Sequence, residues 1–487
     1  MRGPRGTYPS LTDDRCRHIG WLPDRVPVGS LLVRSSVPAQ SPADHDRLTD
    51  LVIDLGGGEE NIDTYDQLQG LVGKVRRATR FFAPIQYDVA RQVRTDIAQR
   101  RAATRALPQR QPVAVPRRAG QDPAGRPPAV LFGLHWLEMG GAERWAFDCI
   151  RLAKEAGLVP IVVTDRDSSH PWITQLDDDA VVVPMTHPIT MGHDAAFLDG
   201  IFAAYDVRGV HVHHNTWMYD RLPWIKSVRP DIPVVDSLHI LEWRTGGFVD
   251  HSVCMSNMID EHHVISPQLR DYLAGKHGIA ASKVRLATLA DLTTGDLTHD
   301  SALSPHEPFT VTYIGRFHQQ KRPYLFLRLA AELKRKSNRP VRFIMHGDGP
   351  LAREVHALRS RLNLADVLEL RGPDKPVRST LAESDVMVIT SENEGLSLTS
   401  FEATAAGVPV VSTDVGSQAS LVADDLLCPR HTYPFIRTAT RRIETLASSA
   451  DQRKRWFDEQ ARKADALRAL PAALDWARDL YAGWSRA

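Results

Sequence analysis

Apolar segments of strand character alternate with helical segments twice along this chain, and this alternation limits the fold most narrowly. A first series begins at Ala129 and ends near Leu297, and a second begins at Phe309 and ends at Ser412. Residues 142–156, for example, form an amphipathic helical stretch between two such apolar segments. This order is typical of parallel, doubly wound sheets. We therefore expect an α/β protein with two Rossmann-like domains facing a cleft, where ligands bind at the carboxyl ends of the strands.

The expected strands are short and rich in Val, Ile, Leu and Phe. In the first series they are 129–134, 160–164, 181–183, 210–212, 234–237 and 264–265, and in the second 309–315, 341–345, 367–370, 386–389 and 408–412. We expect four regions, namely an N-terminal extension (1–128), a first domain (129–300), a second domain (301–450) and a helical C-terminal region (451–487).

Composition excludes several classes of protein. The 487 residues carry 60 basic and 59 acidic side chains, a formal net charge of +1, so we expect no nucleic-acid partner. The cysteines, Cys16, Cys149, Cys254 and Cys428, lie far apart without a Cys-x-x-Cys pair, which favours a reduced, cytoplasmic protein. No apolar run is long enough to cross a bilayer, so the protein is expected to be at most peripheral to the inner membrane face.

The N-terminal extension is open to two interpretations. Residues 71–106 have helix-forming composition with many arginines and a break at Pro84, and residues 100–128 form an Arg/Pro-rich linker. The arginines are either a solvated helix face or a contact for an anionic membrane surface or a partner protein. We expect the linker to be protease-sensitive, and a chain that starts near Pro127 to fold and still bind its ligand.

Two carboxylates bracket a turn between an expected strand and an expected helix. Glu394 lies in the turn, and Glu402 lies about two turns into the helix. The backbone N–H groups of Gly395 and Leu396 are expected at the helix N-terminus, where an anion such as pyrophosphate is stabilised. Because carboxylates repel phosphate, these two more plausibly accept hydrogen bonds from the hydroxyls of a sugar or ribose.

The sequence Glu-Gly-Leu-x5-Glu, followed by Ala-x-Ala-x-Gly-Val-Pro-Val-Val, resembles the donor-site signature of family 4 retaining glycosyltransferases, which have the GT-B fold. The resemblance covers roughly residues 129–447 and implies that Glu394 contacts the donor sugar and Glu402 the nucleotide ribose. It also implies that 129–300 is the acceptor-side domain, that 301–450 binds the nucleotide sugar, and that a C-terminal helix within 451–487 braces the first domain.

Cationic and glycine-rich segments follow the expected strands of the second domain. Arg316 and Lys321 come just after residues 309–315, where two cations can neutralise a diphosphate, and the resemblance gives them that role. Gly347, in the turn 346–350, resembles the family's turn near the nucleotide base, although its glycines also suit an ordinary turn.

Three residues of the first domain are further candidates. Gly140 and Gly141 let the backbone approach a ligand closely, and the resemblance places them near donor phosphate or acceptor. His239 ends an expected strand, where the family carries a histidine near the donor sugar and the acceptor hydroxyl; the alternative is a structural histidine. Weaker acceptor-side candidates are His214, Asn215, Trp217, Glu242, Trp243 and Arg244.

A metal site at His211, His213 and His214 is not expected, because alternate residues of a strand point to opposite faces and no cysteine or carboxylate set accompanies them. The chain departs from the family at Ser420, where the family has Glu, and at 289–292, where only the Asp of an Asn-Gly-Val-Asp turn is kept.

We therefore expect a retaining glycosyltransferase that moves a sugar from a nucleoside diphosphate sugar to a hydroxyl of a carbohydrate, lipid-linked or small-molecule acceptor. No cofactor and no metal are expected, since Arg316, Lys321 and a helix N-terminus supply positive charge. The alternatives are a GT-B nucleotide-sugar epimerase or phosphorylase, and a non-catalytic scaffold subunit that kept the donor pocket. The sequence specifies neither the sugar, the base, the acceptor nor the oligomeric state.

Overall fold

The computed structural model describes residues 71–102, 107, 109–110, 125–138, 140–166, 168, 170–176, 180–184, 193–242, 246–289 and 305–486. Most of the expected Arg/Pro-rich linker lies outside these residues, as do Trp243, Arg244 and the end of the 289–292 turn.

The first domain is a parallel sheet of seven strands in the order β3-β2-β1-β4-β5-β6-β7. Its strands are β1 (Pro128–Leu134), β2 (Val159–Thr164), β3 (Val181–Pro184), β4 (Asp206–His213), β5 (Val234–Leu238), β6 (Glu261–Val264) and β7 (Val284–Leu286). The connecting helices are α3 (Gly141–Glu155), α4 (His193–Ala204), α5 (Thr216–Val228), α6 (Phe248–Cys254) and α7 (Pro267–Asp271). The sheet reverses its strand order between β1 and β4, where ligands bind in doubly wound folds.

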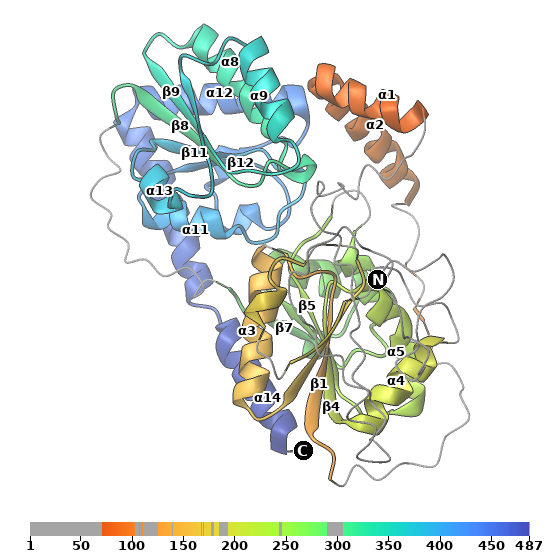
Figure 1. The fold of residues 1–487 in the computed structure, drawn as a ribbon. Helices are drawn as coiled ribbons and strands as arrows, with labels where there is room; N and C mark the ends of the chain where they lie inside the picture. The colour runs from red at the N-terminus through yellow and green to blue at the C-terminus, as the bar shows by residue number, and fades with distance from the viewer. Residues whose placement is uncertain are drawn as a thin grey trace.

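The second domain is a parallel sheet of six strands in the order β10-β9-β8-β11-β12-β13. Its strands are β8 (Phe309–Ile314), β9 (Val341–His346), β10 (Leu368–Arg371), β11 (Val386–Ile389), β12 (Val410–Thr413) and β13 (Leu427–Cys428). The helices are α8 (Pro323–Lys336), α9 (Ala352–Arg361), α10 (Val377–Leu381), α11 (Leu398–Ala405) and α12 (Thr432–Ser448). The expected arrangement of two Rossmann-like domains is confirmed (Figure 1).

The strands are apolar along their length because helices cover both faces of each sheet. Ala129, Val130, Leu131 and Phe132 of β1 alternate between the two faces, yet all four are completely buried. Near-continuous burial of this kind is characteristic of parallel sheets. Separate apolar clusters form on the two faces of the first sheet, and a third surrounds the second sheet.

The C-terminal helices connect the two domains. α13 (Ala450–Arg468) packs on the second domain, where the Gln460 side chain accepts from the backbone of Val410 and donates to the carbonyl of Val408. α14 (Ala473–Arg486) packs beside α3 of the first domain (Figure 1). Its Tyr481 hydroxyl lies 2.7 Å from Nδ1 of His211.

The connection between α13 and α14 touches the end of the first domain. The N–H of Thr288, just after β7, donates to the carbonyl of Pro471 at 2.8 Å, and the N–H of Ala473 donates to the carbonyl of Thr288 at 3.0 Å. The chain leaves the first domain and returns to it at one place.

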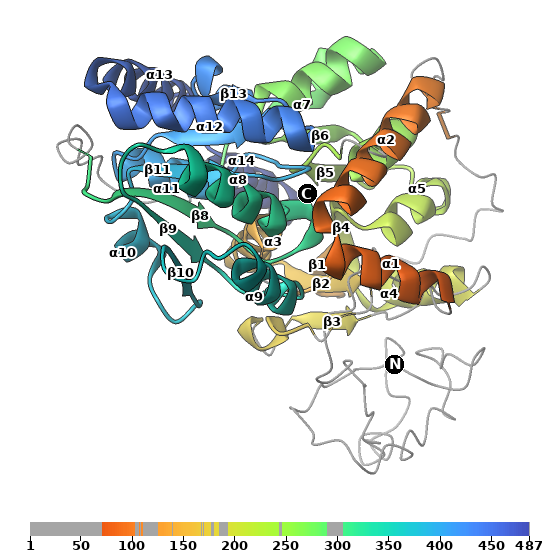
Figure 2. The same ribbon diagram turned by 90° about the horizontal axis from the view of Figure 1, so that it is seen from above.

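Two N-terminal helices, α1 (Leu71–Phe82) and α2 (Pro84–Ala102), lie on the second domain beside α8, α9 and α12 (Figures 1 and 2). Arg80 pairs with Glu354 of α9 at 3.3 Å, and the Arg361 guanidinium donates to the carbonyls of Phe81 and Phe82. These contacts contradict a purely solvated helix face, and the boundary expected at residue 128 therefore separates helices from the domain on which they pack. Within the described part of the chain, no helix combines the length and apolarity needed to cross a membrane.

Candidate functional site

The carboxyl ends of the two sheets meet at Gly395 and His239. A Cβ placed on Gly395 would lie 2.1 Å from the carbonyl oxygen of His239, far inside contact distance. Gly141 approaches from the same domain as His239, and a Cβ there would stand 3.6 Å from Cδ1 of Leu398. The structure thus brings together the glycine-led turn of the second domain and two segments singled out in the first. Only glycine permits the approach at position 395.

Glu394 and Lys321 form an ion pair within the second domain. The Lys321 Nζ lies 2.7 Å from Oε1 of Glu394, and the Ser391 hydroxyl donates to the same oxygen at 2.5 Å. Glu394 is only 6% exposed. Arg316 is exposed, and its carbonyl accepts from the Tyr313 hydroxyl at 2.9 Å. Two cations and one carboxylate predicted from sequence are therefore carried by neighbouring loops.

Those two loops are joined by backbone and side-chain hydrogen bonds. The N–H of Glu392 donates to the carbonyl of Gln320 at 2.7 Å, and the Gln320 amide donates to the carbonyl of Asn393 at 3.0 Å. The Thr390 hydroxyl donates to the carbonyl of Lys321 at 2.7 Å. We call residues 318–322 the cation loop and residues 390–395 the acidic loop. Because several hydrogen bonds connect the two loops, the position of Lys321 depends on that of Glu394.

A third loop closes over the acidic loop. Gly416 has φ of +56°, and a Cβ there would lie 1.8 Å from the carbonyl oxygen of Glu394. The neighbouring Ser417 hydroxyl lies 2.6 Å from that of Ser266 in the first domain, and Ser420 donates to Gln268 at 2.7 Å. Ser420, where the family pattern has Glu, therefore joins the two domains in this chain.

The helix after the acidic loop starts later than expected. α11 begins at Leu398, so the N–H groups of Gly395 and Leu396 lie in the preceding turn. The prediction that they stand at the helix N-terminus was therefore wrong by two to three residues. The Leu396 side chain is buried in the apolar cluster of the first domain, so the turn also helps to pack the two domains together.

Glu402 lies on α11 and faces the first domain. Burial raises its pKa, and the charge of Arg144 on α3 partly opposes that shift. Apart from this electrostatic interaction, no side-chain partner of Glu402 is present among the described residues. A half-buried carboxylate without a hydrogen-bond donor is suited to accept hydrogen bonds from a ligand.

Gly347 is required because its backbone packs closely against Gly315, the residue that follows β8. Its φ is +153°, and a Cβ there would lie 2.0 Å from the carbonyl oxygen of Gly315. The backbone turn alone therefore explains this glycine, and its place near a nucleotide base stays a prediction.

Gly140 lies beside a buried carboxylate that sequence reasoning did not single out. A Cβ on Gly140 would stand 2.0 Å from Oε2 of Glu143. Glu143 accepts from Trp136 Nε1 at 2.7 Å and lies 2.9 Å from His135 Nε2. Burial raises the pKa of Glu143, but the hydrogen bond and charge of His135 outweigh burial and lower it to about 2. Its position in the first turn of α3 was the available sequence signal, since acidic residues favour helix N-termini.

His239 lies at the end of β5 among other histidines. It is 5% exposed, its ring stacks on His213, and it meets His214 edge to face. Neither ring nitrogen has a hydrogen-bond partner among the described residues. Burial holds the pKa of His239 well below its usual range, so the ring is neutral near pH 7. A neutral imidazole can donate from one nitrogen and accept at the other.

The argument against a metal at His211 was wrong in two respects. His211 and His213 are two residues apart on β4 and share one face, and Cys149 of α3 lies beside them. The ligand atoms of these three buried residues lie within 4.8 Å of one another. Both ring nitrogens of His211 already bond, to the hydroxyls of Tyr481 and Ser237. The expectation that no metal is needed stays a prediction.

A pocket of about 520 Å³ opens in the first domain. Its lining includes Arg166, Thr216, Asp220, Glu242, Phe248 and Asp250. Of the weaker acceptor-side candidates, Glu242 lines this pocket. Asn215 instead caps α5 by accepting from the N–H of Met218 at 2.6 Å, and Trp217 is buried in the core.

Comparison with known proteins shows a similarity that centres on the second domain. Residues 296–463 match the model of glycosyl transferases group 1. The D-inositol 3-phosphate glycosyltransferase of Corynebacterium diphtheriae is 27% identical over 261 residues, 47% of this chain and 61% of that protein. The D-inositol 3-phosphate glycosyltransferase 2 of Catenulispora acidiphila is 27% identical over 245 residues, 44% of this chain and 56% of that protein. The matches span less than two thirds of the length of these relatives.

Solved structures share the architecture. A glycosyltransferase from Rickettsia africae superimposes with a TM-score of 0.54 at 15% identity, covering 74% of this chain and 99% of that one. Anabaena Alr3699/HepE, in complex with UDP and glucose, gives 0.53 at 16% identity, covering 73% and 98%. The chain therefore shares the GT-B fold of these structures, and its residues 296–463 are similar to the glycosyl transferases group 1.

Proposed function

We propose that this protein transfers a sugar from a nucleoside diphosphate sugar to a hydroxyl acceptor, with retention of the anomeric configuration. One observation carries the proposal: the Lys321–Glu394 pair, 2.7 Å apart, stands beside the turn that contacts His239 of the other domain. Cations for a diphosphate, a carboxylate for sugar hydroxyls and a neutral histidine are thus gathered where the two domains meet.

Catalysis would rest on positive side chains that are already in position before the reaction begins. When the bond between the sugar and the diphosphate breaks, negative charge grows on the leaving phosphate. Lys321 and Arg316 are placed on the loops that follow the strands to stabilise that charge, and fixed cations need no rearrangement during reaction. The Glu394 carboxylate, released in part from Lys321, would accept from sugar hydroxyls and hold the ring in position.

Glu402 would bind the ribose. Its carboxylate is half-buried and has no hydrogen-bond donor among the described residues, so ribose hydroxyls would supply those hydrogen bonds. In the proposed reaction the acceptor hydroxyl attacks on the face from which the diphosphate leaves, so no covalent intermediate with a protein side chain is needed.

The acceptor would enter from the first domain. The pocket that includes Arg166, Asp220 and Asp250 offers both signs of charge, which suits a polar, hydroxyl-bearing molecule. Inositol 3-phosphate is the first acceptor to test, because relatives carry it in their names. Arg110 and Arg166 both line the pocket, and we propose that Arg166 contacts the phosphate.

The test is release of nucleoside diphosphate from UDP-, GDP- and ADP-sugars, with and without inositol 3-phosphate or simple sugars. We expect one donor class to give acceptor-dependent release. The anomeric coupling constant of the product, measured by NMR, then reports retention or inversion. Binding of a nucleotide sugar without release under any condition would favour the scaffold subunit, and an inverted product would contradict the retaining mechanism.

A further inference from the structure

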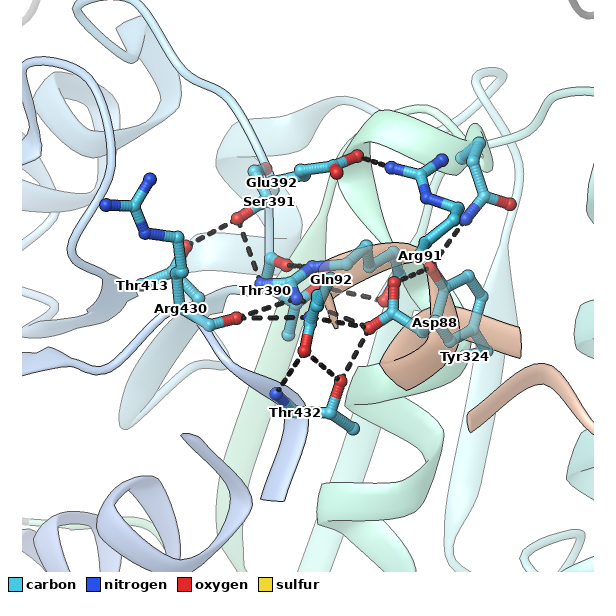
Figure 3. A network of polar contacts seen from close by, with 12 residues as sticks. Asp88, Arg91, Gln92, Tyr324, Thr390, Ser391, Glu392, Thr413, Arg430 and Thr432 are labelled. Carbon is cyan, nitrogen blue, oxygen red and sulfur yellow. Dashed lines mark hydrogen bonds and ion pairs between the residues drawn. The ribbon is translucent and has the colours of Figure 1, made fainter. Parts of the chain in front are cut away.

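Helix α2 contributes two buried charges to the loops that carry Lys321 and Glu394. Asp88 is 1% exposed and forms an ion pair with Arg322. Arg91 is 9% exposed and pairs with Glu392 (Figure 3). Arg322, the partner of Asp88, directly follows Lys321. Glu392, the partner of Arg91, lies two residues before Glu394. The expected family resemblance begins after α2, so it assigns nothing to these residues.

Arg322 is held in a conformation that its surroundings must maintain. It has φ of 46° and ψ of 56°, the left-handed region that non-glycine residues rarely adopt, and it directly follows Lys321. Such conformations persist only where neighbouring contacts over-determine them. The guanidinium donates to the carbonyls of Thr390 at 2.6 Å and Ser391 at 3.1 Å. Arg322 thereby joins the cation loop to the acidic loop.

Asp88 compensates the charge of Arg322. Three of the acceptors around this guanidinium are backbone carbonyls, and within the described residues Asp88 is the one carboxylate that pairs with it. Asp88 also accepts from the hydroxyls of Tyr324 at 2.9 Å and Thr432 at 2.7 Å, so its position is fixed from both sides (Figure 3). Without the carboxylate, a cation in the protein interior would lose its counter-charge, which favours loop rearrangement.

Arg91 acts on the acidic loop. Its partner Glu392 is 5% exposed, and the N–H of Glu392 donates to Gln320 in the cation loop. Removing Arg91 would leave a buried carboxylate two residues before Glu394, with solvation available only if the loop opens.

We infer that Asp88 and Arg91 are positioning residues: α2 fixes the cation and acidic loops so that Lys321 and Glu394 stand ready for the donor diphosphate and sugar. The N-terminal helices are then a working part of the donor site. This inference rests on the proposed function, but its central claim, that α2 holds two loops in place, can be measured without sugar transfer.

The experiment compares full-length variants by backbone hydrogen exchange and by kinetics. Asp88→Asn and Arg91→Gln remove one charge each at similar size. Two controls lie on the same helix. Asp96→Asn removes a partly exposed pair with His431, a docking contact outside both loops. Arg94→Gln changes an exposed side chain with no hydrogen bond or ion pair to the described residues.

We expect Asp88→Asn and Arg91→Gln to speed exchange in peptides covering 316–323 and 389–397, with β1 unchanged. In kinetic assays, KM for the donor should rise and kcat should fall, each by about tenfold or more, because a small displacement of Lys321 and Glu394 slows the reaction strongly. The KM for the acceptor should stay constant. Both controls should behave as the parental protein. Reversing the pair, with Arg91→Glu and Glu392→Arg together, should recover the exchange rates and the donor KM.

Unchanged exchange of both loops in Asp88→Asn and Arg91→Gln would overturn the inference. So would equal loop opening in Asp96→Asn, since α2 would then act by docking alone, or faster exchange throughout the chain that charge reversal does not recover. If the parental protein neither bound UDP, GDP or ADP nor released them from nucleotide sugars, the proposed function would fail. The exchange comparison would still decide whether α2 holds the loops.

Discussion

The carbonyl oxygen of His239 lies against Gly395, with room for a hydrogen atom and none for a methyl group. Two domains therefore touch through backbone atoms at the point where the proposed reaction takes place. Gly395→Ala should force these backbones apart and lower kcat/KM roughly a hundredfold, because a shift of about 1 Å is enough for such a loss. Gly483→Ala, in open space on α14, is the matched control and should keep full activity. Normal kinetics of Gly395→Ala would show that the contact is absent during turnover.

Glu402→Gln should weaken nucleoside diphosphate binding by about tenfold to a hundredfold, the equivalent of roughly 1.5–3 kcal/mol for a charge-assisted hydrogen bond. Titration calorimetry with the diphosphate found to bind measures this directly. Glu394→Gln should chiefly lower turnover, because its carboxylate is proposed to hold the donor sugar. Parental affinity in the first variant and parental kcat in the second would remove both glutamates from the donor site.

The pH dependence of Glu402 has a defined sign. Burial raises its pKa in the folded protein above the ordinary 4.5, so its protonated form is favoured by folding. The stability that it contributes is present below pH 4.5 and is lost as the pH rises through the raised pKa. At neutral pH, Glu402→Gln should therefore raise the melting temperature while it weakens nucleotide binding. The affinity of the parental protein for nucleotide should fall as the pH decreases toward that pKa. The affinity of Glu402→Gln should not change over the same pH range.

Arg316→Ala and Lys321→Ala should each reduce transfer by about a hundredfold, as on removal of one donor that stabilises a transition state. The affinity for a nucleoside without phosphates should barely change, because no phosphate is present for the cation to contact. Isothermal titration with the nucleoside and its diphosphate separates the two effects. Equal losses for both ligands would indicate a folding defect.

A chelator should leave transfer intact, because the proposed site uses Lys321 and Arg316 for positive charge. The assay is initial rate after dialysis against EDTA, followed by addition of Mg²⁺ or Mn²⁺. Abolished activity that returns with either metal would contradict a metal-independent mechanism. Cys149→Ser tests the buried Cys149–His211–His213 group separately and should not alter the rate.

Removal of the residues before Pro127, which include α1 and α2, should abolish tight nucleotide binding. The composition of the linker had instead suggested that such a fragment still binds its ligand. A chain beginning near Pro127 lacks Asp88 and Arg91, and it exposes the face of the second domain on which α1 and α2 pack. Thermal shift with UDP, GDP and ADP compares this fragment with one beginning at residue 71. Equal stabilisation of both fragments by nucleotide would restore the boundary at 128.

The parallel, doubly wound arrangement and most strands could be predicted because short apolar segments alternate regularly with helical segments. β7 and β13 were missed. Both are edge strands, β7 carries the exposed Arg285 at its centre, and β13 has only two residues. Gly395, Glu394 and Lys321 carried enough local chemistry to be selected. Their mutual placement followed from the rule that strand carboxyl ends share one edge of a sheet.

The docking of α2 could not be predicted, because composition shows that a helix is polar without showing which surface it meets. A signal was nevertheless present. Asp88, Arg91 and Gln92 have i, i+3 and i+4 spacing, which places three polar side chains on one face of the helix. All three are buried against the second domain. A similar limit applies to Arg322, whose left-handed backbone depends on distant acceptors.

The paired backbone hydrogen bonds at Thr288 form a pivot. The segment that leaves the first domain and the segment that returns from the second are hydrogen-bonded to each other there, so we expect relative motion of the domains to turn about this place. Opening the domains for a substrate would then be a swing about this pivot. Such a swing would separate His239 from Gly395 and break the Ser417–Ser266 bond, while Lys321, Glu394 and α2 would travel together as one rigid piece.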